Sequence, residues 1–166
     1  MYSDPLQHAC IAAAVVAPLV RRSGRGVLVA AVVPALAIDA DHLIAARSVR
    51  VGDITSLATR PRTHSALGAL GAGAVVAAAT GPVHGWATFA GLASHLLHDA
   101  GDRAAPTPVL WPFAPARQLG RARQLALSSV LLIASLALSR ATAAPWTEPL
   151  SAAAGDGGAA SPPRTA

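Results

Sequence analysis

Long apolar runs alternate with short polar stretches along the chain, and this alternation predicts five helices. Between Thr63 and His98 there are 36 residues without one Asp, Glu, Lys or Arg. A Thr-Gly-Pro-Val-His-Gly turn at 80–85 interrupts that stretch, so we expect a helical hairpin there. Pro34 predicts a kink in the second helix, because proline removes a backbone hydrogen bond from a helix interior. The predicted helices are 9–20, 27–46, 64–79, 86–98 and 124–139.

This pattern predicts an all-α fold with short helices in an antiparallel bundle, because short turns make neighbouring helices antiparallel. We expect residues 1–140 to form one domain. The Ala/Gly/Pro/Ser-rich segment 141–166 is expected to be a disordered tail.

The composition indicates a membrane protein. Hydrophobic residues make up 53% of the chain and charged residues 13%, against about 25% in soluble domains. The mean hydropathy is +0.47. A predicted helix such as 64–79 rises only about 24 Å, less than the roughly 30 Å hydrocarbon core, so a soluble alanine-rich bundle or a partly embedded one is the alternative. We favour a multi-pass membrane protein, because the hairpin and the last helix have no polar face.

The basic residues predict contact with membrane lipids. All 13 are arginines, and the formal net charge is +5. They lie in short stretches between helices without interleaved aromatic side chains, so we expect anionic lipid headgroups as their partners and no direct binding of nucleic acid. A single cysteine, Cys10, excludes a disulfide framework and a cysteine-rich zinc module, and we expect it to be buried.

The ionisable residues inside the apolar runs are expected to meet at one end of the bundle. Such residues are costly in a membrane and are therefore functional candidates. In an antiparallel bundle the start of the first helix, the end of the second, the start of the third and the end of the fourth lie together. The residues expected there are His8, Asp39, Asp41, His42, His64, His95 and Asp99.

The chemistry of this set fits a divalent metal ion. His95 and Asp99 are four residues apart and project from one helix face. Asp39 and Asp41 would repel each other without a nearby cation. Imidazole and carboxylate ligands suit zinc, and also manganese or iron.

The predicted metal ligands are His8, Asp41, His64, His95 and Asp99, with Asp39 as the alternative to Asp41. Asp39 and His42 are the candidate catalytic residues. A simpler role is open for each residue, since an aspartate at a helix end can be a cap and a lone histidine is often structural. We assign the structural role to His84, which lies in the turn at the opposite end, and expect His98 either to orient a ligand or to be exposed.

Four sequence blocks resemble those of a known family. They are Asp39-Ala40-Asp41-His42, Arg60-Pro61-Arg62-Thr63-His64-Ser65, Ser94-His95-Leu96-Leu97-His98-Asp99 and Trp111-Pro112-Phe113. In this order they are similar to the Asp-x-Asp-His, Arg-Gly-x-Thr-His-Ser, Ser-His-x-x-x-Asp and Trp-Pro-Phe blocks of the YdjM-like family. His8 is similar to the N-terminal histidine of that family. The family's glycine is replaced here by Pro61.

Members of the YdjM-like family are described as LexA-binding, inner-membrane-associated metal-dependent hydrolases. More distantly, the pattern is similar to zinc-dependent phospholipase C. The resemblance implies a membrane-bound hydrolase that acts on a phosphoester or lipid-type substrate through a metal-activated water. The alternative is a non-catalytic membrane protein with a structural metal site that binds a regulatory protein. A metal-ion carrier ranks last, because the polar residues gather at one end and not at mid-membrane depth.

Overall fold

The computed structural model describes residues 5–101 and 105–142, and within these ranges the chain is helical, without a β-strand. The prediction of an all-α fold is therefore confirmed. The expected tail beyond residue 142 lies outside the described residues. The elements are α1 (Pro5–Ser23), α2 (Gly26–Ala37), the 3-10 turn η1 (Ile38–Ala40), α3 (Asp41–Ala46), α4 (Val51–Thr55), α5 (Ala66–Thr80), α6 (Pro82–Gly101) and α7 (Arg121–Ala141).

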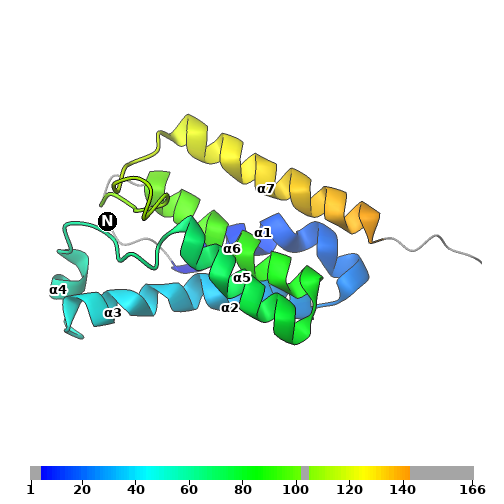
Figure 1. Ribbon diagram of the computed structural model, residues 1–166, viewed down its shortest axis with the longest axis horizontal. Helices are drawn as coiled ribbons and strands as arrows, with labels where there is room; N and C mark the ends of the chain where they lie inside the picture. Colours follow the sequence, from blue (N-terminus) through cyan, green and yellow to red (C-terminus); the bar gives the residue numbers. More distant parts are fainter. Residues whose placement is uncertain (1–4, 102–104, 143–166) are drawn as a thin grey trace, which may run out of the picture.

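The long helices form an antiparallel bundle around α6 (Figure 1). Helix α6 contacts α1, α2, α5 and α7, and most of its residues are buried. The end of the bundle that holds the starts of α1, α5 and α7 and the ends of α3 and α6 is called the site end below. The opposite end, with the α1–α2 and α5–α6 turns, is called the far end.

Several helices differ from the predicted ones at their ends. Helix α6 begins at Pro82 instead of Trp86, because proline fits the first turn of a helix, where its missing N–H is not needed. The expected loop 47–62 contains the short helix α4. Helix α5 begins after His64, because the Ser65 hydroxyl accepts a hydrogen bond from the backbone N–H of Gly68 and caps the helix.

Cys10 was expected to be buried, and this expectation is wrong. The residue lies on the exposed face of α1. The buried positions of that helix are His8, Ala12, Val15, Val16 and Leu19, which follow the helical spacing of one face. Cys10 falls between them on the other side.

Glycine allows α6 to approach two of its neighbours, α2 and α5, closely. A Cβ atom on Gly91 would lie 2.3 Å from the backbone oxygen of Ala31 on α2. A Cβ atom on Gly73 of α5 would lie 2.9 Å from the backbone oxygen of Gly85. The helix backbones therefore touch, which brings the continuation of α2 into η1 close to the second half of α6.

Pro34 leaves an unpaired carbonyl in α2 that α6 satisfies. Proline has no N–H, so the backbone oxygen of Ala30, four residues earlier, loses its helical partner. The Thr88 hydroxyl on α6 donates a hydrogen bond of 2.8 Å to that oxygen. This contact fixes α2 against α6 at the level where proline interrupts the helix.

The outer surface of the bundle is apolar. The continuous helical segment Gly26–Ala46 and helix α7 are each long and apolar enough to cross a membrane, and α5 is a shorter apolar helix. Large hydrophobic side chains on these helices point outward with little cover from the rest of the protein. They include Val29, Val33, Leu70, Val75, Leu125, Val130 and Ile133. A surface of this kind favours contact with lipid over contact with water.

Candidate metal centre

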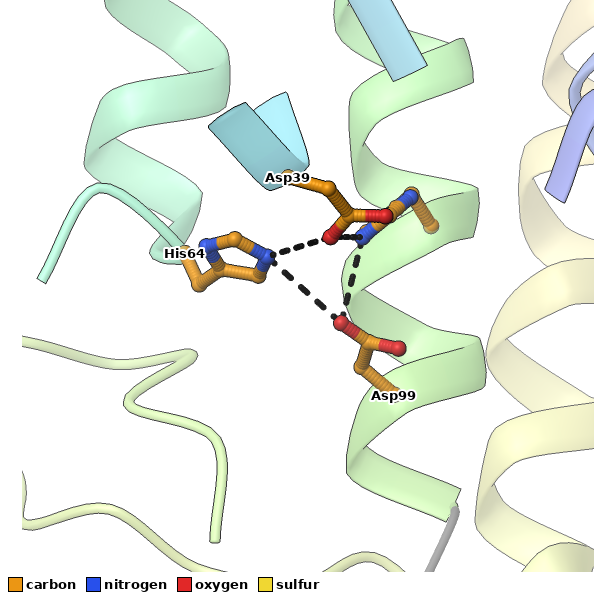
Figure 2. Close-up of side chains that lie close together, drawn as sticks. Asp39, His64 and Asp99 are labelled. Atoms are coloured by element: carbon orange, nitrogen blue, oxygen red, sulfur yellow. Dashed lines mark ion pairs between the residues drawn. The ribbon is translucent and has the colours of Figure 1, made fainter. Parts of the chain in front are cut away.

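Histidine and aspartate side chains from four separate elements meet at the site end. His8 comes from α1, Asp39 from η1, His64 from the residues just before α5, and His95 and Asp99 from α6. Asp39, His64 and Asp99 point toward one another in Figure 2. The side chains of His8, His64, His95 and Asp99 are fully buried, whereas that of Asp39 is 34% exposed.

Four donor atoms form the centre of this cluster. The Nε2 atom of His95 lies 3.3 Å from Oδ1 of Asp39 and 3.1 Å from Oδ2 of Asp99. The Nε2 atom of His64 lies 3.5 Å and 3.6 Å from the same two oxygens. Donor atoms about 2.0–2.1 Å from a tetrahedral zinc ion would be about 3.3–3.4 Å apart. The spacing therefore fits a metal ion at the centre of the group, whose four donor atoms lie within 4.8 Å of one another.

Unsatisfied polar atoms support the same fit. Both ring nitrogens of His95, Nε2 of His64 and both carboxylate oxygens of Asp99 are buried and have no hydrogen-bond partner among the described residues. Buried polar atoms without partners are expensive, and a buried carboxylate most of all. A divalent cation would use the free lone pairs of the two histidines and would share the charge of Asp99 with Arg60, whose Nη1 atom lies 3.0 Å from Oδ2.

Asp41 holds His64 from the side opposite the four-atom group. Its Oδ2 atom lies 3.0 Å from Nδ1 of His64 and also accepts a hydrogen bond from the Thr63 hydroxyl. Burial alone would lower the pKa of His64, but its hydrogen bonds to Asp39 and Asp41 raise that pKa above the ordinary value. A carboxylate bonded to one ring nitrogen directs the other nitrogen toward a metal.

The structure thus groups Asp39, and not Asp41, with His64, His95 and Asp99. Asp41 belongs instead to a second group with His42 and His64, in which Nδ1 of His42 lies 2.9 Å from Oδ1 of Asp41. His64 is common to both groups, with one ring nitrogen facing each.

His8 lies beside the four-atom group. Its ring stacks on that of His95 with 3.8 Å between the ring centroids. Its Nε2 atom is 3.5 Å from Oδ1 of Asp99, the oxygen that faces away from the group. His98, which was expected to orient a ligand or be exposed, is partly buried and packs edge-on against His8.

Arg60 is a site residue that the sequence pattern did not single out. Its Nη1 atom lies 3.0 Å from Oδ2 of Asp99, and its side chain is only 9% exposed. The one signal in the sequence is its place at the start of the Arg-x-x-Thr-His block. His84, in contrast, lies at the far end, where a Cβ atom on Gly26 would be 3.1 Å from its Nε2 atom.

The comparisons with known proteins agree with the sequence blocks. The model of the YdjM inner membrane protein family matches residues 3–158, nearly the whole chain. No curated protein and no solved structure matches the chain, so the more distant resemblance to zinc-dependent phospholipase C has no support. With its apolar outer helices and a family match over this length, the chain belongs to the YdjM inner membrane protein family and is a membrane protein.

Proposed function

We propose that this protein is a multi-pass, membrane-bound, metal-dependent hydrolase that acts on a phosphoester, with zinc as the favoured metal and manganese or iron as alternatives. The observation that carries this proposal is the group of four donor atoms from Asp39, His64, His95 and Asp99. Two nitrogens and two oxygens are a donor set that zinc, manganese and iron all accept.

The proposed ligands are the four residues of that group. Four protein ligands fill a tetrahedral shell, so a water would have to bind as a fifth ligand, which zinc can accept and which the higher coordination numbers of manganese and iron allow. A divalent cation bound there would supply Lewis acidity and lower the pKa of a water toward about 7, which makes a hydroxide nucleophile available at neutral pH. Asp41 keeps the Nδ1 proton of His64 and thereby leaves Nε2 free to bind metal. His8 limits the movement of the His95 ring by stacking on it.

His42 is the proposed proton acceptor. Its Nδ1 atom is paired with Asp41, which fixes the tautomer whose Nε2 atom can accept a proton. The ring is nearly buried, and Nε2 lies 3.5 Å from Nη1 of Arg60. His42 therefore faces the same space as the guanidinium group beside Asp99.

Two features support catalysis over a purely structural metal. Structural zinc sites are closed and commonly use cysteine, whereas catalytic sites keep an open position. The group here contains no thiolate, and the side chain of Asp39 is about one third exposed. The group therefore comes nearest to the surface on the side of η1, and we expect solvent and substrate to approach it from there.

The membrane setting supports a substrate with a phosphoester in or near the lipid headgroups. The two candidate spans, Gly26–Ala46 and α7, carry apolar side chains on the outside of the bundle, and Asp39 of the metal group lies in the last third of the first of them. A site there lies nearer to one membrane surface than to the midplane, on the side of the phosphate headgroups.

The test is hydrolysis of bis(p-nitrophenyl) phosphate by detergent-purified protein, stripped with a chelator and reloaded with zinc or manganese. We expect activity only after reloading. His42→Ala should keep the metal and lose most of the turnover, because His42 is outside the four-atom group. If the protein holds metal tightly but hydrolyses no phosphodiester or phosphomonoester, the alternative of a structural metal in a partner-binding protein replaces this proposal.

A further inference from the structure

Arg60 is a buried cation at the edge of the four-atom group. Its Nη1 atom lies 3.0 Å from Oδ2 of Asp99, the same oxygen that approaches the Nε2 atoms of His64 and His95. Its Nε atom is also buried and has no hydrogen-bond partner among the described residues. One edge of the guanidinium therefore carries a donor that the surrounding protein leaves unused.

The backbone holds this side chain in place. The N–H of Arg60 donates to the backbone oxygen of Pro106, and the N–H of Ala66 donates to that of Val109. The segment 60–66 is thus tied at both ends to the loop that follows α6. A preorganised guanidinium loses little freedom when it binds a ligand.

With a metal ion bound, the charges around Arg60 would favour the binding of an anion. A divalent cation and the guanidinium of Arg60 would together carry one more charge than the two carboxylates, Asp39 and Asp99, that face them. Asp41 lies farther away, beyond the ring of His64, with its oxygens on the Nδ1 atoms of His64 and His42, so it weakens this positive charge only from a distance. An anionic ligand that touches both the metal and Arg60 would neutralise the site.

A phosphoryl group fits these requirements. Its oxygens match the planar donor fork of a guanidinium, and several oxygens are available at once, so one can face the metal while another accepts from Arg60. A carboxylic ester is neutral and offers no such charge. We propose that Arg60 binds the phosphoryl group of the substrate, which makes the substrate an anionic phosphoester; this inference rests on the proposed metal-dependent function.

Cobalt substitution with phosphate titration tests the inference without measuring turnover. Detergent-purified full-length protein is stripped, loaded with Co²⁺ and titrated with inorganic phosphate while the visible spectrum of the ion is recorded. Arg60→Gln should bind Co²⁺ with an unchanged starting spectrum. Its spectral shift should need roughly 10- to 100-fold more phosphate, the loss expected for one hydrogen bond to a charged group.

Arg62→Gln is the matched control, because the Arg62 side chain is exposed and its guanidinium lies 5.5 Å from the Trp111 ring centroid, outside the metal group. It should titrate like the wild type. Arg60→Lys keeps the charge but loses the fork, so its phosphate affinity should fall between those of the wild type and Arg60→Gln. This second variant keeps the inference testable if Arg60→Gln does not fold.

The possible results separate the inference from the function on which it rests. If wild-type protein binds no Co²⁺, the proposed function fails. If all variants bind Co²⁺ and titrate with the same amount of phosphate, the role of Arg60 is refuted and the metal centre stands. Loss of Co²⁺ from both Arg60 variants would make Arg60 a support for Asp99 and would also refute the inference.

Two further titrations identify the source of the phosphoryl group. Glycerol 3-phosphate represents a soluble phosphoester, and phosphatidate in mixed micelles represents a lipid headgroup. Tighter binding of phosphatidate than of glycerol 3-phosphate would support a lipid substrate, and equal binding a soluble one. In both cases the inference requires that Arg60→Gln weaken the binding.

Discussion

The two ends of the helix bundle both carry arginines and histidine, yet their surroundings differ completely. At the far end His84 stands alone, and the two turns 21–26 and 80–85 contain neither aspartate nor glutamate. At the site end four histidines and three aspartates lie within reach of one another. Histidine by itself therefore marks no site in an apolar chain. A site is marked by buried histidines that share buried carboxylates.

The two ends also differ in energetic cost. At the far end the imidazole of His84 is only partly buried, and the turns around it contain no carboxylate. The site end buries Asp99 completely, with both oxygens lacking hydrogen-bond partners among the described residues. Arg60, whose Nη1 atom lies 3.0 Å from Oδ2, compensates the charge of Asp99, but Asp39 and Asp41 form ion pairs only with histidines among the described residues. Burying an unpaired carboxylate costs several kcal/mol, so a bound cation would explain this gathering of carboxylates better than stability does.

The strongest contrast between the ends should appear in metal content. His95→Ala and Asp99→Ala each remove a donor of the four-atom group, so each should lose most of the bound metal after purification. His84→Ala, at the far end, should keep the wild-type amount. Elemental analysis of the detergent-purified proteins measures this. Equal metal content in all three variants would show that the two ends do not differ in the proposed way.

The ends should also lie on opposite sides of the membrane. Connections at the site end are richer in arginine than those at the far end, and the positive-inside rule then places the site end in the cytoplasm. In a variant lacking Cys10, an impermeant thiol reagent added to intact cells should label Thr80→Cys and leave Ser56→Cys unlabelled. Labelling of Ser56→Cys instead would reverse the assigned orientation.

Within the site end, Asp41 and Asp39 should contribute unequally to metal binding. Asp41 contacts His64 from outside the four-atom group, so Asp41→Asn should weaken metal binding by about 10- to 100-fold without abolishing it. Asp39→Asn should have the larger effect, because Asp39 contributes one of the four donor atoms. Competition with a chelator of known affinity gives both values. A larger loss in Asp41→Asn would exchange the roles of the two aspartates.

The smallest expected effect is a change in stability from substitutions in the middle of the bundle. There the close contact of α2 with α6 sets the distance between Asp39 and His95. Gly91→Ala would place a Cβ atom against the Ala31 carbonyl and should destabilise the protein by about 1–3 kcal/mol. Gly71→Ala meets nothing within 4 Å and should stabilise α5 by up to about 1 kcal/mol. Thermal unfolding in detergent measures both. Similar melting temperatures for the two variants would show that α2 and α6 do not touch as described.

The convergence of polar residues could be predicted because it depends only on helix direction. The apolar runs give the helices, the short turns make them antiparallel, and the ends that bear His64 and His95 must then coincide. The family resemblance followed from the same residues. The all-α fold and the family are confirmed, whereas the roles of the individual site residues stay predictions.

The choice between Asp39 and Asp41 could not be made from the sequence. The two residues lie in and directly after the 3-10 turn η1, where each residue advances about 120° around the axis, whereas an α-helix advances about 100°. Over two residues the difference between the two helix types changes the direction of a side chain by about 40°. The direction of each aspartate therefore depends on the residue at which the 3-10 turn begins. Arg60 was missed for a related reason. It lies in a loop, where no periodic pattern indicates which side chain points inward.

X-ray absorption at the metal edge of zinc-loaded wild-type protein can establish whether two histidines and two aspartates hold a metal ion at the site end. We expect a first shell of nitrogen and oxygen atoms at about 2.0–2.1 Å, with the outer-shell scattering of two imidazole rings and no sulfur at about 2.3 Å. In Asp41→Asn protein the outer-shell scattering of one imidazole should become weaker but should not vanish. In His84→Ala protein the scattering of both imidazoles should be unchanged. A first shell without imidazole, or zinc that a brief wash with chelator removes completely, would contradict the proposed metal centre.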